Sequence, residues 1–270
     1  MPTVLDDIIV GVREDLEDRR RATSLQRMRE NALQASPARD AWAALRGGRS
    51  DASGLRVISE VKRSSPSKGV LADISAPADL ARSYQCGGAS VISVLTERRR
   101  FGGSLADLDA VRAAVEIPVL RKDFTVDEYQ IHEARAHGAD LVLLIVAALD
   151  DHQLKDFLDL THELGMNALV EAHTPEEIER AAALQPRIIG VNVRNLKTLE
   201  VDPSSYGRLA PLLPSDVVQI AESGVDGPQD AAEYARHGAD AILVGEALVR
   251  HGDPARAIQD FRAAASAAVR

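Results

Sequence analysis

The chain has 270 residues, of which 45% are hydrophobic, and its 41 acidic against 32 basic residues give a formal net charge of −9. That charge repels nucleic-acid phosphates and anionic lipid, and only 3% of the residues are aromatic, so we expect neither a nucleic-acid nor a membrane partner. The single cysteine, Cys86, excludes an internal disulfide and a thiolate metal cluster, which fits a reducing cytoplasm.

The apolar segments are too charged or too short for export or for membrane insertion. Residues 1–12 contain two aspartates and have no leading basic segment, unlike a secretory signal. The longest apolar run, Leu141 to Leu149, has nine residues, whereas a bilayer-spanning helix needs about 20. We therefore expect neither a signal peptide nor a spanning helix.

Residues 1–56 are predicted to form a helical extension ahead of the first strand. Their apolar side chains recur at the spacing of a helix, at Val4, Leu5, Ile8, Ile9, Val12 and Leu16. Residues 41–45 favour a second, short helix before two glycines. We interpret residues 1–56 as a cap on the main body, residues 57–270, so that the chain is one domain overall.

Three glycines reveal a repeat in the main body. Gly138 and Gly238 follow Gly88 by 50 and 150 residues, and each is followed by a short apolar run. A glycine suits the left-handed position that ends a helix, and the run after it is typical of a buried parallel strand. Near residue 188 Pro186 takes the same stopping role. The repeating unit is therefore a helix, a stop and a strand.

All such runs together predict eight strands, which begin near residues 57, 90, 118, 140, 167, 188, 217 and 240. Amphipathic stretches lie between them, for example residues 104–115 and 175–184, with Ser104 and Thr174 as N-caps. Eight strand–helix units in about 210 residues predict an α/β fold, a single (β/α)8 TIM barrel with an N-terminal helical extension. A doubly wound open sheet is the alternative, but no Gly-x-Gly-x-x-Gly fingerprint follows the first strand.

The predicted strands have polar C-terminal ends, where a (β/α)8 barrel carries its active site. These ends hold Glu60, Lys62, Lys122, Glu171, Asn192, Arg194, Glu222 and Ser223. Alternation directs Glu60 and Lys62 to the same side of their strand. The charges could form an ion network that merely closes the barrel. We favour an active site, because five strands contribute polar residues at matching ends.

Loops rich in small residues predict a phosphate site beside these charges. They are Ser64 to Gly69 after the first strand, Ser223-Gly224 after the seventh and Gly245-Glu246 after the eighth. Small residues let backbone N–H groups converge on an anion, and the last two loops are the usual phosphate cradle of this fold.

The histidines do not predict a metal site. His132 and His137 imitate a zinc-binding helix motif, but a spacing of five residues turns them about 140° apart on a helix. We therefore expect no metal.

The strand ends also carry a series of longer motifs. They read Glu60-Val-Lys-Arg-Ser-Ser-Pro-Ser-Lys-Gly69, Val94-Leu-Thr-Glu97, Phe101-Gly-Gly-Ser104, Leu120-Arg-Lys-Asp-Phe124, Leu169-Val-Glu171, Gly190-Val-Asn-Val-Arg-Asn-Leu196, Ala221-Glu-Ser-Gly224 and Leu243-Val-Gly-Glu246. In this order they resemble the motifs of the indole-3-glycerol phosphate synthase family. The resemblance covers essentially the whole chain, including the helical extension.

The resemblance implies a lyase of tryptophan biosynthesis. Its substrate, 1-(2-carboxyphenylamino)-1-deoxyribulose 5-phosphate, would close to indole-3-glycerol phosphate with loss of carbon dioxide and water. At matching positions, Lys122 would be the general acid of ring closure. Glu171 and Glu60 would serve the proton transfers of dehydration. Lys62 would face the substrate carboxylate, and Asn192 would orient the acid and the substrate.

The same resemblance implies the binding residues. Arg194, Glu222 and Ser223 would bind the sugar hydroxyls, and the phosphate would bind Ser65, Gly224, Gly245 and Glu246, the last through its backbone amide. Phe101 and Phe124 would either line the aryl ring or belong to the core. We expect no cofactor, a small phosphosugar as the only partner, and a monomer.

Elementary chemistry supports these roles independently. Ring closure gives a proton to a developing alkoxide and dehydration takes one from the ring, so acid and base must coexist at one pH. A protonated lysine beside an ionised glutamate meets this need, because opposite charges favour both charged forms. Two lysines in one mouth should also lower each other's pKa, which would bring Lys122 closer to a useful acid strength.

Two other functions compete with this interpretation. A related barrel could isomerise phosphoribosyl anthranilate, but such an isomerase typically uses a cysteine and an aspartate at strand ends, not a Glu60/Lys62 pair with Lys122. A noncatalytic phosphosugar-binding barrel could keep the glycine loops, but loss of function should erase Lys122 or Glu171. Val193, where relatives often carry a polar residue, should point away from Asn192 and matter little.

Overall fold

The computed structural model describes residues 3–48, 54–71, 74–250 and 252–269. Its main body is a closed barrel of eight parallel strands in the order β1-β10-β9-β8-β7-β6-β5-β4. The strands are β1 (Arg56–Val61), β4 (Val91–Leu95), β5 (Val119–Lys122), β6 (Leu141–Ile145), β7 (Asn167–Ala172), β8 (Ile188–Asn192), β9 (Val218–Glu222) and β10 (Ala241–Val244). The barrel confirms the predicted fold, and each strand begins within one residue of its predicted start.

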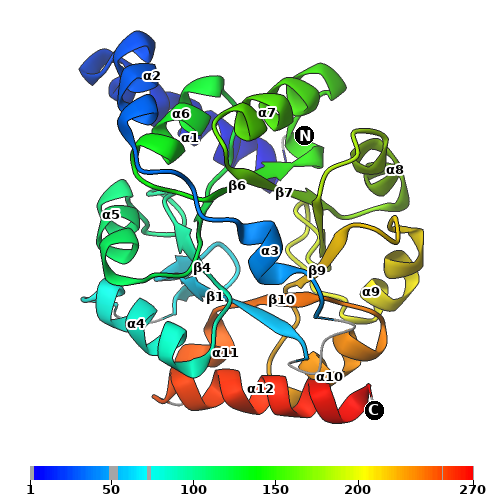
Figure 1. Ribbon diagram of the computed structural model, residues 1–270. Coiled ribbons are helices and arrows are strands. Elements are labelled where there is room, and N and C mark those ends of the chain that lie inside the picture. Colours follow the sequence, from blue (N-terminus) through cyan, green and yellow to red (C-terminus); the bar gives the residue numbers. More distant parts are fainter. Residues whose placement is uncertain (1–2, 49–53, 72–73, 251, 270) are drawn as a thin grey trace.

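Helices follow the strands and pack around the barrel (Figure 1). They are α4 (Pro77–Gly87), α5 (Leu105–Ala114), α6 (Glu128–Ala136), α7 (Asp151–Glu163), α8 (Pro175–Ala183), α9 (Ser204–Leu209), α10 (Pro228–Arg236), α11 (Glu246–Val249) and α12 (Pro254–Ala268), with short 3-10 turns at Val146–Ala148 and Ala210–Leu212. Ser104 and Thr174 cap α5 and α8 as predicted, each accepting a backbone N–H. Gly88, with φ of 94°, ends α4 in the left-handed conformation that its place in the repeat predicts.

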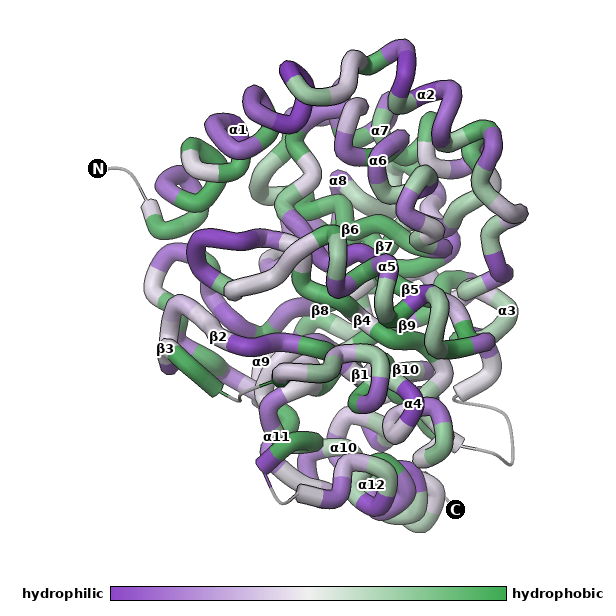
Figure 2. The backbone as a smooth tube through the Cα atoms, turned by 90° about the vertical axis from the view of Figure 1, so that its left-hand side faces the viewer, coloured by the Kyte–Doolittle hydropathy of each residue, from purple (hydrophilic) through white to green (hydrophobic). Residues whose placement is uncertain are grey.

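Alternation divides the core into two layers. Side chains such as Ile58, Leu120 and Leu169 fill the barrel interior, while their neighbours in sequence, such as Val57 and Val119, face the surrounding helices. Figure 2 shows this arrangement as hydrophobic strands inside helices with hydrophilic outer faces. Strands buried on both faces explain why each one is a continuous apolar run in the sequence.

The N-terminal extension contacts both ends of the barrel. Helix α1 (Val4–Ala22) places Leu5, Ile8 and Val12 in one cluster with Phe124 and Val126, beyond the C-terminal end of β5. Helix α2 (Leu25–Gln34) follows, and α3 (Ala41–Leu45) lies across the opposite, N-terminal end of the barrel (Figure 1). The Trp42 backbone N–H there donates to Asn167 Oδ1 at the start of β7, at 3.1 Å.

The loop after β1 contains a small hairpin that was not predicted. Its strands β2 (Ser64–Ser65) and β3 (Gly69–Val70) pair antiparallel, with Ser64 opposite Val70. In Figure 2 this hairpin and α1 lie on the left and α3 lies on the right, at opposite ends of the barrel. The hairpin therefore stands beside the barrel mouth, where the strands end.

Candidate active site

A cavity of about 460 Å³ opens at the C-terminal ends of the strands. It is lined by nearly all of the predicted site residues: Glu60, Lys62, Phe101, Lys122, Phe124, Glu171, Asn192, Arg194, Glu222, Ser223, Gly224, Gly245 and Glu246. Ser65 is not among the lining residues, but Ser67 and Lys68 of the same loop are. The hairpin therefore offers Ser67 and Lys68 to the cavity where the sequence suggested Ser65.

Lys122, at the end of β5, is the central cation of the cavity. Its Nζ lies 2.9 Å from Glu222 Oε2, 3.8 Å from Glu171 Oε2 and 3.9 Å from Glu60 Oε2. These carboxylates come from β9, β7 and β1, so closure of the barrel brings them to one lysine that is only 13% exposed. The charged residues at the ends of these strands therefore do meet in the structure, around Lys122.

The prediction that the pKa of Lys122 is lowered is wrong. Burial alone would lower the pKa of the ammonium, but the carboxylates of Glu222, Glu60 and Glu171 outweigh burial and raise it above its ordinary value. The prediction considered the positive charge of Lys62 near Lys122 but not the three carboxylates that surround Lys122. Lys122 consequently enters any reaction fully protonated.

Glu60 and Lys62 face the cavity from the end of β1. Lys62 Nζ lies 2.7 Å from Glu60 Oε1, and Ser93 Oγ donates to Glu60 Oε2 at 3.4 Å. Burial opposes ionisation of Glu60, yet Lys62 and Lys122 together keep its pKa below the ordinary value. Glu60 is therefore an ionised carboxylate with a cation at each oxygen.

Glu171 and Glu222 form a carboxyl pair with unequal surroundings. Glu171 has Lys122 at one oxygen and His173 at the other, 3.2 Å away, whereas among the described residues Lys122 is the only cation paired with Glu222. No donor among the described residues reaches Glu222 Oε1, which is buried. Burial and the neighbouring charge of Glu171 raise the pKa of Glu222 to about 8. Burial also opposes ionisation of Glu171, but His173 and Lys122 lower its pKa to about 2.

A glycine makes room for this pair. A Cβ at Gly190, in the middle of β8, would lie 2.1 Å from Glu222 Oε1. Only a residue without a side chain therefore lets the carboxyl of Glu222 occupy its place beside Lys122.

Asn192 is oriented by its neighbours at the end of β8. Its Oδ1 accepts from Ser223 Oγ at 2.9 Å and from the Arg194 backbone N–H at 3.0 Å. The amide nitrogen is thus the end of the side chain available to a ligand. Ser223 holds a φ of 69°, and Tyr234 Oη donates to its carbonyl at 3.1 Å. A non-glycine residue rarely adopts this conformation, and such strain is typical of functional sites.

The opposite end of the cavity suits an anion. Lys68 Nζ lies 2.6 Å from Glu246 Oε1, and Arg194 Nη1 donates to Ser67 Oγ at 3.3 Å. Gly245 fits closely against β1, since a Cβ there would lie 3.0 Å from the Cβ of Glu60. Two cationic side chains, Lys68 and Arg194, therefore line the cavity together with Gly245, from the loops after β1, β8 and β10.

Phe101 and Phe124 line the cavity and also belong to the core. Their ring centroids are 6.1 Å apart and the rings are tilted by 40°. Both line the cavity, and both also pack in the cluster that includes the barrel interior and α1. They are core residues whose exposed edges form an apolar wall.

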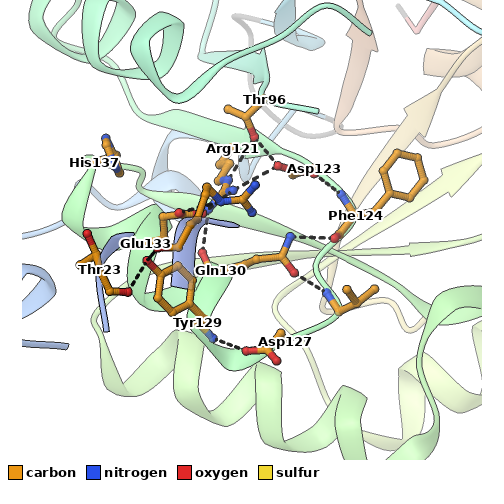
Figure 3. A network of polar contacts seen from close by, with 12 residues as sticks. Thr23, Thr96, Arg121, Asp123, Phe124, Asp127, Tyr129, Gln130, Glu133 and His137 are labelled. Carbon is orange, nitrogen blue, oxygen red and sulfur yellow. Dashed lines mark hydrogen bonds and ion pairs between the residues drawn. The ribbon is translucent and has the colours of Figure 1, made fainter. Parts of the chain in front are cut away.

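A second charge network surrounds Arg121, the residue that precedes Lys122 on β5 (Figure 3). Arg121 Nη2 lies 3.1 Å from Asp123 Oδ2 and 2.9 Å from Glu133 Oε2, and its Nε donates to Thr96 Oγ1 at 3.1 Å. Glu133 also pairs with Arg19 of α1, at 2.9 Å. The network therefore ties the mouth helix to the strand that carries Lys122.

Val193 and His173 complete the residues around the site. Val193 is buried in the layer between strands and helices, which confirms that it points away from Asn192.

His173 was missed in the sequence analysis, although its position two residues after Glu171 predicts that both side chains lie on the same side of the chain. Its side chain is 9% exposed and lies between Glu171 and Glu177.

Comparisons with known proteins agree with this geometry. A family model described as indole-3-glycerol phosphate synthase matches residues 5–261. The indole-3-glycerol phosphate synthase of Micrococcus luteus is 69% identical over 97% of this chain and 98% of its own length, and that of Paenarthrobacter aurescens is 67% identical over 99% and 98%.

Solved structures support the fold alone. A 3-hexulose-6-phosphate synthase superposes with a TM-score of 0.62 at 20% identity, covering 78% of this chain and 98% of that one. A second, from Salmonella typhimurium, gives 0.64 at 14% identity, covering 79% of this chain and 100% of that one. Family match, close relatives and fold all agree: the chain belongs to the indole-3-glycerol phosphate synthase family.

Proposed function

We propose that the protein converts 1-(2-carboxyphenylamino)-1-deoxyribulose 5-phosphate to indole-3-glycerol phosphate, a decarboxylating ring closure of tryptophan biosynthesis. The observation that carries this proposal is the placement of Lys122. Its ammonium stands among three carboxyl groups at one end of a cavity whose other end suits an anion. A substrate with a reactive ketone between an aryl carboxylate and a phosphate has the matching order of groups.

Ring closure begins when the ring carbon that bears the carboxylate attacks the ketone carbon. Lys122 donates its proton to the developing alkoxide, so the ketone oxygen becomes a hydroxyl. The C–C bond to the carboxylate then breaks, carbon dioxide leaves, and its electron pair restores the aromatic ring. Lys62, 2.7 Å from Glu60 but 21% exposed, faces the mouth as the countercharge for the substrate carboxylate.

Dehydration needs a base and a proton source at the same pH. Glu171, ionised because His173 and Lys122 stabilise its charge, takes the proton from the ring carbon beside nitrogen. Lys122, a neutral amine after ring closure, regains a proton from solvent through Glu60, 3.9 Å away, and passes it to the departing hydroxyl. The hydroxyl leaves as water. Asn192 orients the substrate through its amide nitrogen, which can donate to a substrate oxygen.

The remaining contacts hold the sugar and the phosphate. Arg194, Glu222 and Ser223 bind the hydroxyls, and a Glu222 that keeps its proton near neutral pH can donate to one of them. The backbone amides of Gly224, Gly245 and Glu246 bind the phosphate, with Lys68 as the nearby cation. Ser65, on the hairpin, would contact the phosphate only through movement of that loop. Phe101 and Phe124 pack against the aryl ring.

The test is to mix the purified protein with the carboxyphenylamino deoxyribulose phosphate and follow indole absorbance. We expect turnover by the wild type and a loss of about 10²- to 10⁴-fold for Lys122→Met. If the substrate binds without turnover, the protein is a binding barrel. If it is inert and phosphoribosyl anthranilate is consumed instead, the protein is the related isomerase.

We further propose that the enzyme works in the cytoplasm as a monomer on a freely diffusing phosphosugar. None of the helices in the described ranges is long and apolar enough to cross a bilayer. Light scattering during size-exclusion chromatography should give the mass of one 29.0 kDa chain. A mass of twice that value would contradict the monomer.

A further inference from the structure

We propose that His173 is a positioning residue that acts, as a permanent cation, through Glu171: it fixes the Glu171 carboxylate and keeps the shared proton of the carboxyl pair on Glu222. The inference rests on the proposed function of the same site and extends it to a residue outside the cavity lining.

The ring of His173 lies between two carboxylates. Nδ1 is 3.0 Å from Glu177 Oε2, and Nε2 is 3.2 Å from Glu171 Oε1. A neutral ring would have to turn a lone pair toward one of these oxygens, which is repulsive, whereas an imidazolium presents an N–H to both. The Nε2 contact has the length of an ion pair without the alignment of a hydrogen bond. The geometry therefore requires charge, and burial at 9% exposure keeps that charge from being screened by water.

The cap of helix α8 fixes the ring. Thr174 is the N-cap, and its side chain accepts the Glu177 backbone N–H. Glu177 in turn reaches back, so that its Oε2 accepts the His173 backbone N–H at 2.8 Å as well as facing Nδ1. Both the backbone and the ring of His173 are thus bound to one carboxylate on the first turn of a helix. This anchors the imidazolium independently of any ligand.

The consequence appears in the carboxyl pair. Glu171 has a cation at each oxygen, with His173 at Oε1 and Lys122 at Oε2, but in the described part of the chain Glu222 pairs with Lys122 alone. Both carboxyls are buried beside the same Lys122 ammonium, and the charge of Glu171 opposes ionisation of Glu222. A single proton therefore goes to Glu222, the member with fewer cations. Without His173, the nearer Lys122 contact, 2.9 Å to Glu222 against 3.8 Å to Glu171, would favour the proton on Glu171, and the base for dehydration would be lost.

The two carboxylates that contact the ring, Glu171 of β7 and Glu177 of α8, favour its protonated form. Lys122, on the other oxygen of Glu171, opposes protonation of the ring from farther away. Burial alone would lower the pKa of the imidazole, but the two carboxylates raise it to about 10. His173 is thus charged throughout the pH range in which a cytoplasmic enzyme works.

The first test is histidine-ring NMR of the full-length protein without substrate. We expect the His173 ring, assigned by its absence in His173→Gln, to carry protons on both nitrogens from pH 6 to 9 and to titrate near 10. A ring that titrates near the ordinary value of about 6.5 would overturn the proposal. This readout does not depend on activity, so it remains decisive even if the proposed reaction is not observed.

The second test is the pH dependence of kcat in His173→Gln, which keeps a donor and removes the charge. Loss of an opposite charge should raise the pKa of the carboxyl that acts as base by about 1–3 units, so the acid limb of the profile moves upward by that amount. His237→Gln is the matched control, because His237 pairs with Glu233, at 3.0 Å, at the C-terminal end of helix α10 and does not line the cavity. We expect no shift there. A His173→Gln profile that superposes on the wild type would show that the ring only packs.

Discussion

The close approach of Gly190 to Glu222 yields the sharpest prediction about the site. A methyl group at residue 190 would lie 2.1 Å from Glu222 Oε1 and 3.0 Å from Leu169 Cδ1, against an ordinary contact of 3.4 Å or more. Gly190→Ala should therefore push the carboxyl of Glu222 by about 1.3 Å, which breaks its 2.9 Å contact with Lys122. A misplacement of this size costs about 10²-fold in rate.

The same substitution overpacks the barrel interior. Inserting one methyl group into a packed core typically costs about 1–3 kcal/mol, or about 2–12 °C in melting temperature for a domain of this size. Circular dichroism and calorimetry would measure that cost separately from kcat. Gly227→Ala is a suitable control, since its new Cβ would meet only the Gln229 side chain, at 3.5 Å.

A double-mutant cycle distinguishes the proposed cause from a general loss of packing. If Gly190→Ala acts through Glu222, its effect on kcat and that of Glu222→Gln should not add, because both remove the same contact with Lys122. Additive effects, or a Gly190→Ala enzyme with wild-type kcat, would refute the reasoning.

Three further predictions follow from the cavity, the carboxyl pair and the extension. Gly245→Asp puts a negative charge where a backbone amide should approach phosphate, so KM should rise about 10- to 100-fold. The control is Gly165→Asp, in an open turn, which should leave KM unchanged. Equal effects of the two substitutions on KM would remove Gly245 from the phosphate site. Because the pKa of Glu222 is raised to about 8, its protonated form contributes stability that is fully present below about pH 4.5 and lost as the pH rises through 8. The melting temperature should therefore fall over this range less steeply in Glu222→Gln than in the wild type, and parallel curves would contradict the raised pKa. Removing residues 1–22, which include helix α1, should raise KM and leave a folded barrel. Removing residues 1–47 should also lower the melting temperature, because Leu45 of α3 is buried at the N-terminal end of the barrel. If both truncations have the same melting temperature, α3 contributes no stability.

The fold could be predicted because strands buried on both faces leave a direct signal in the sequence. Runs such as Leu141–Ile145 are apolar throughout, and glycines such as Gly138 end the preceding helix in a conformation that other residues avoid. The mouth residues followed from the fold, since the carboxyl ends of all strands in a barrel meet at one side.

Other features depend on which residues meet in space. The raised pKa of Lys122 required the distances to three carboxylates on other strands, and neither composition nor alternation provides them. The placement of Ser67 and Lys68 at the cavity, in preference to Ser65, depends on the pairing of the hairpin. Helical periodicity predicted α1 and α3 but could not tell which end of the barrel each one contacts, because both ends offer an apolar surface.

Single-turnover kinetics of Lys122→Met and Lys62→Met with saturating substrate would test the central claim most directly, because they separate chemistry from binding. If Lys122 is the acid of ring closure, Lys122→Met should slow closure by about 10²- to 10⁴-fold, while Lys62→Met should mainly weaken binding and slow decarboxylation. Wild-type closure in Lys122→Met together with no closure in Lys62→Met would contradict the account and assign the acid to Lys62.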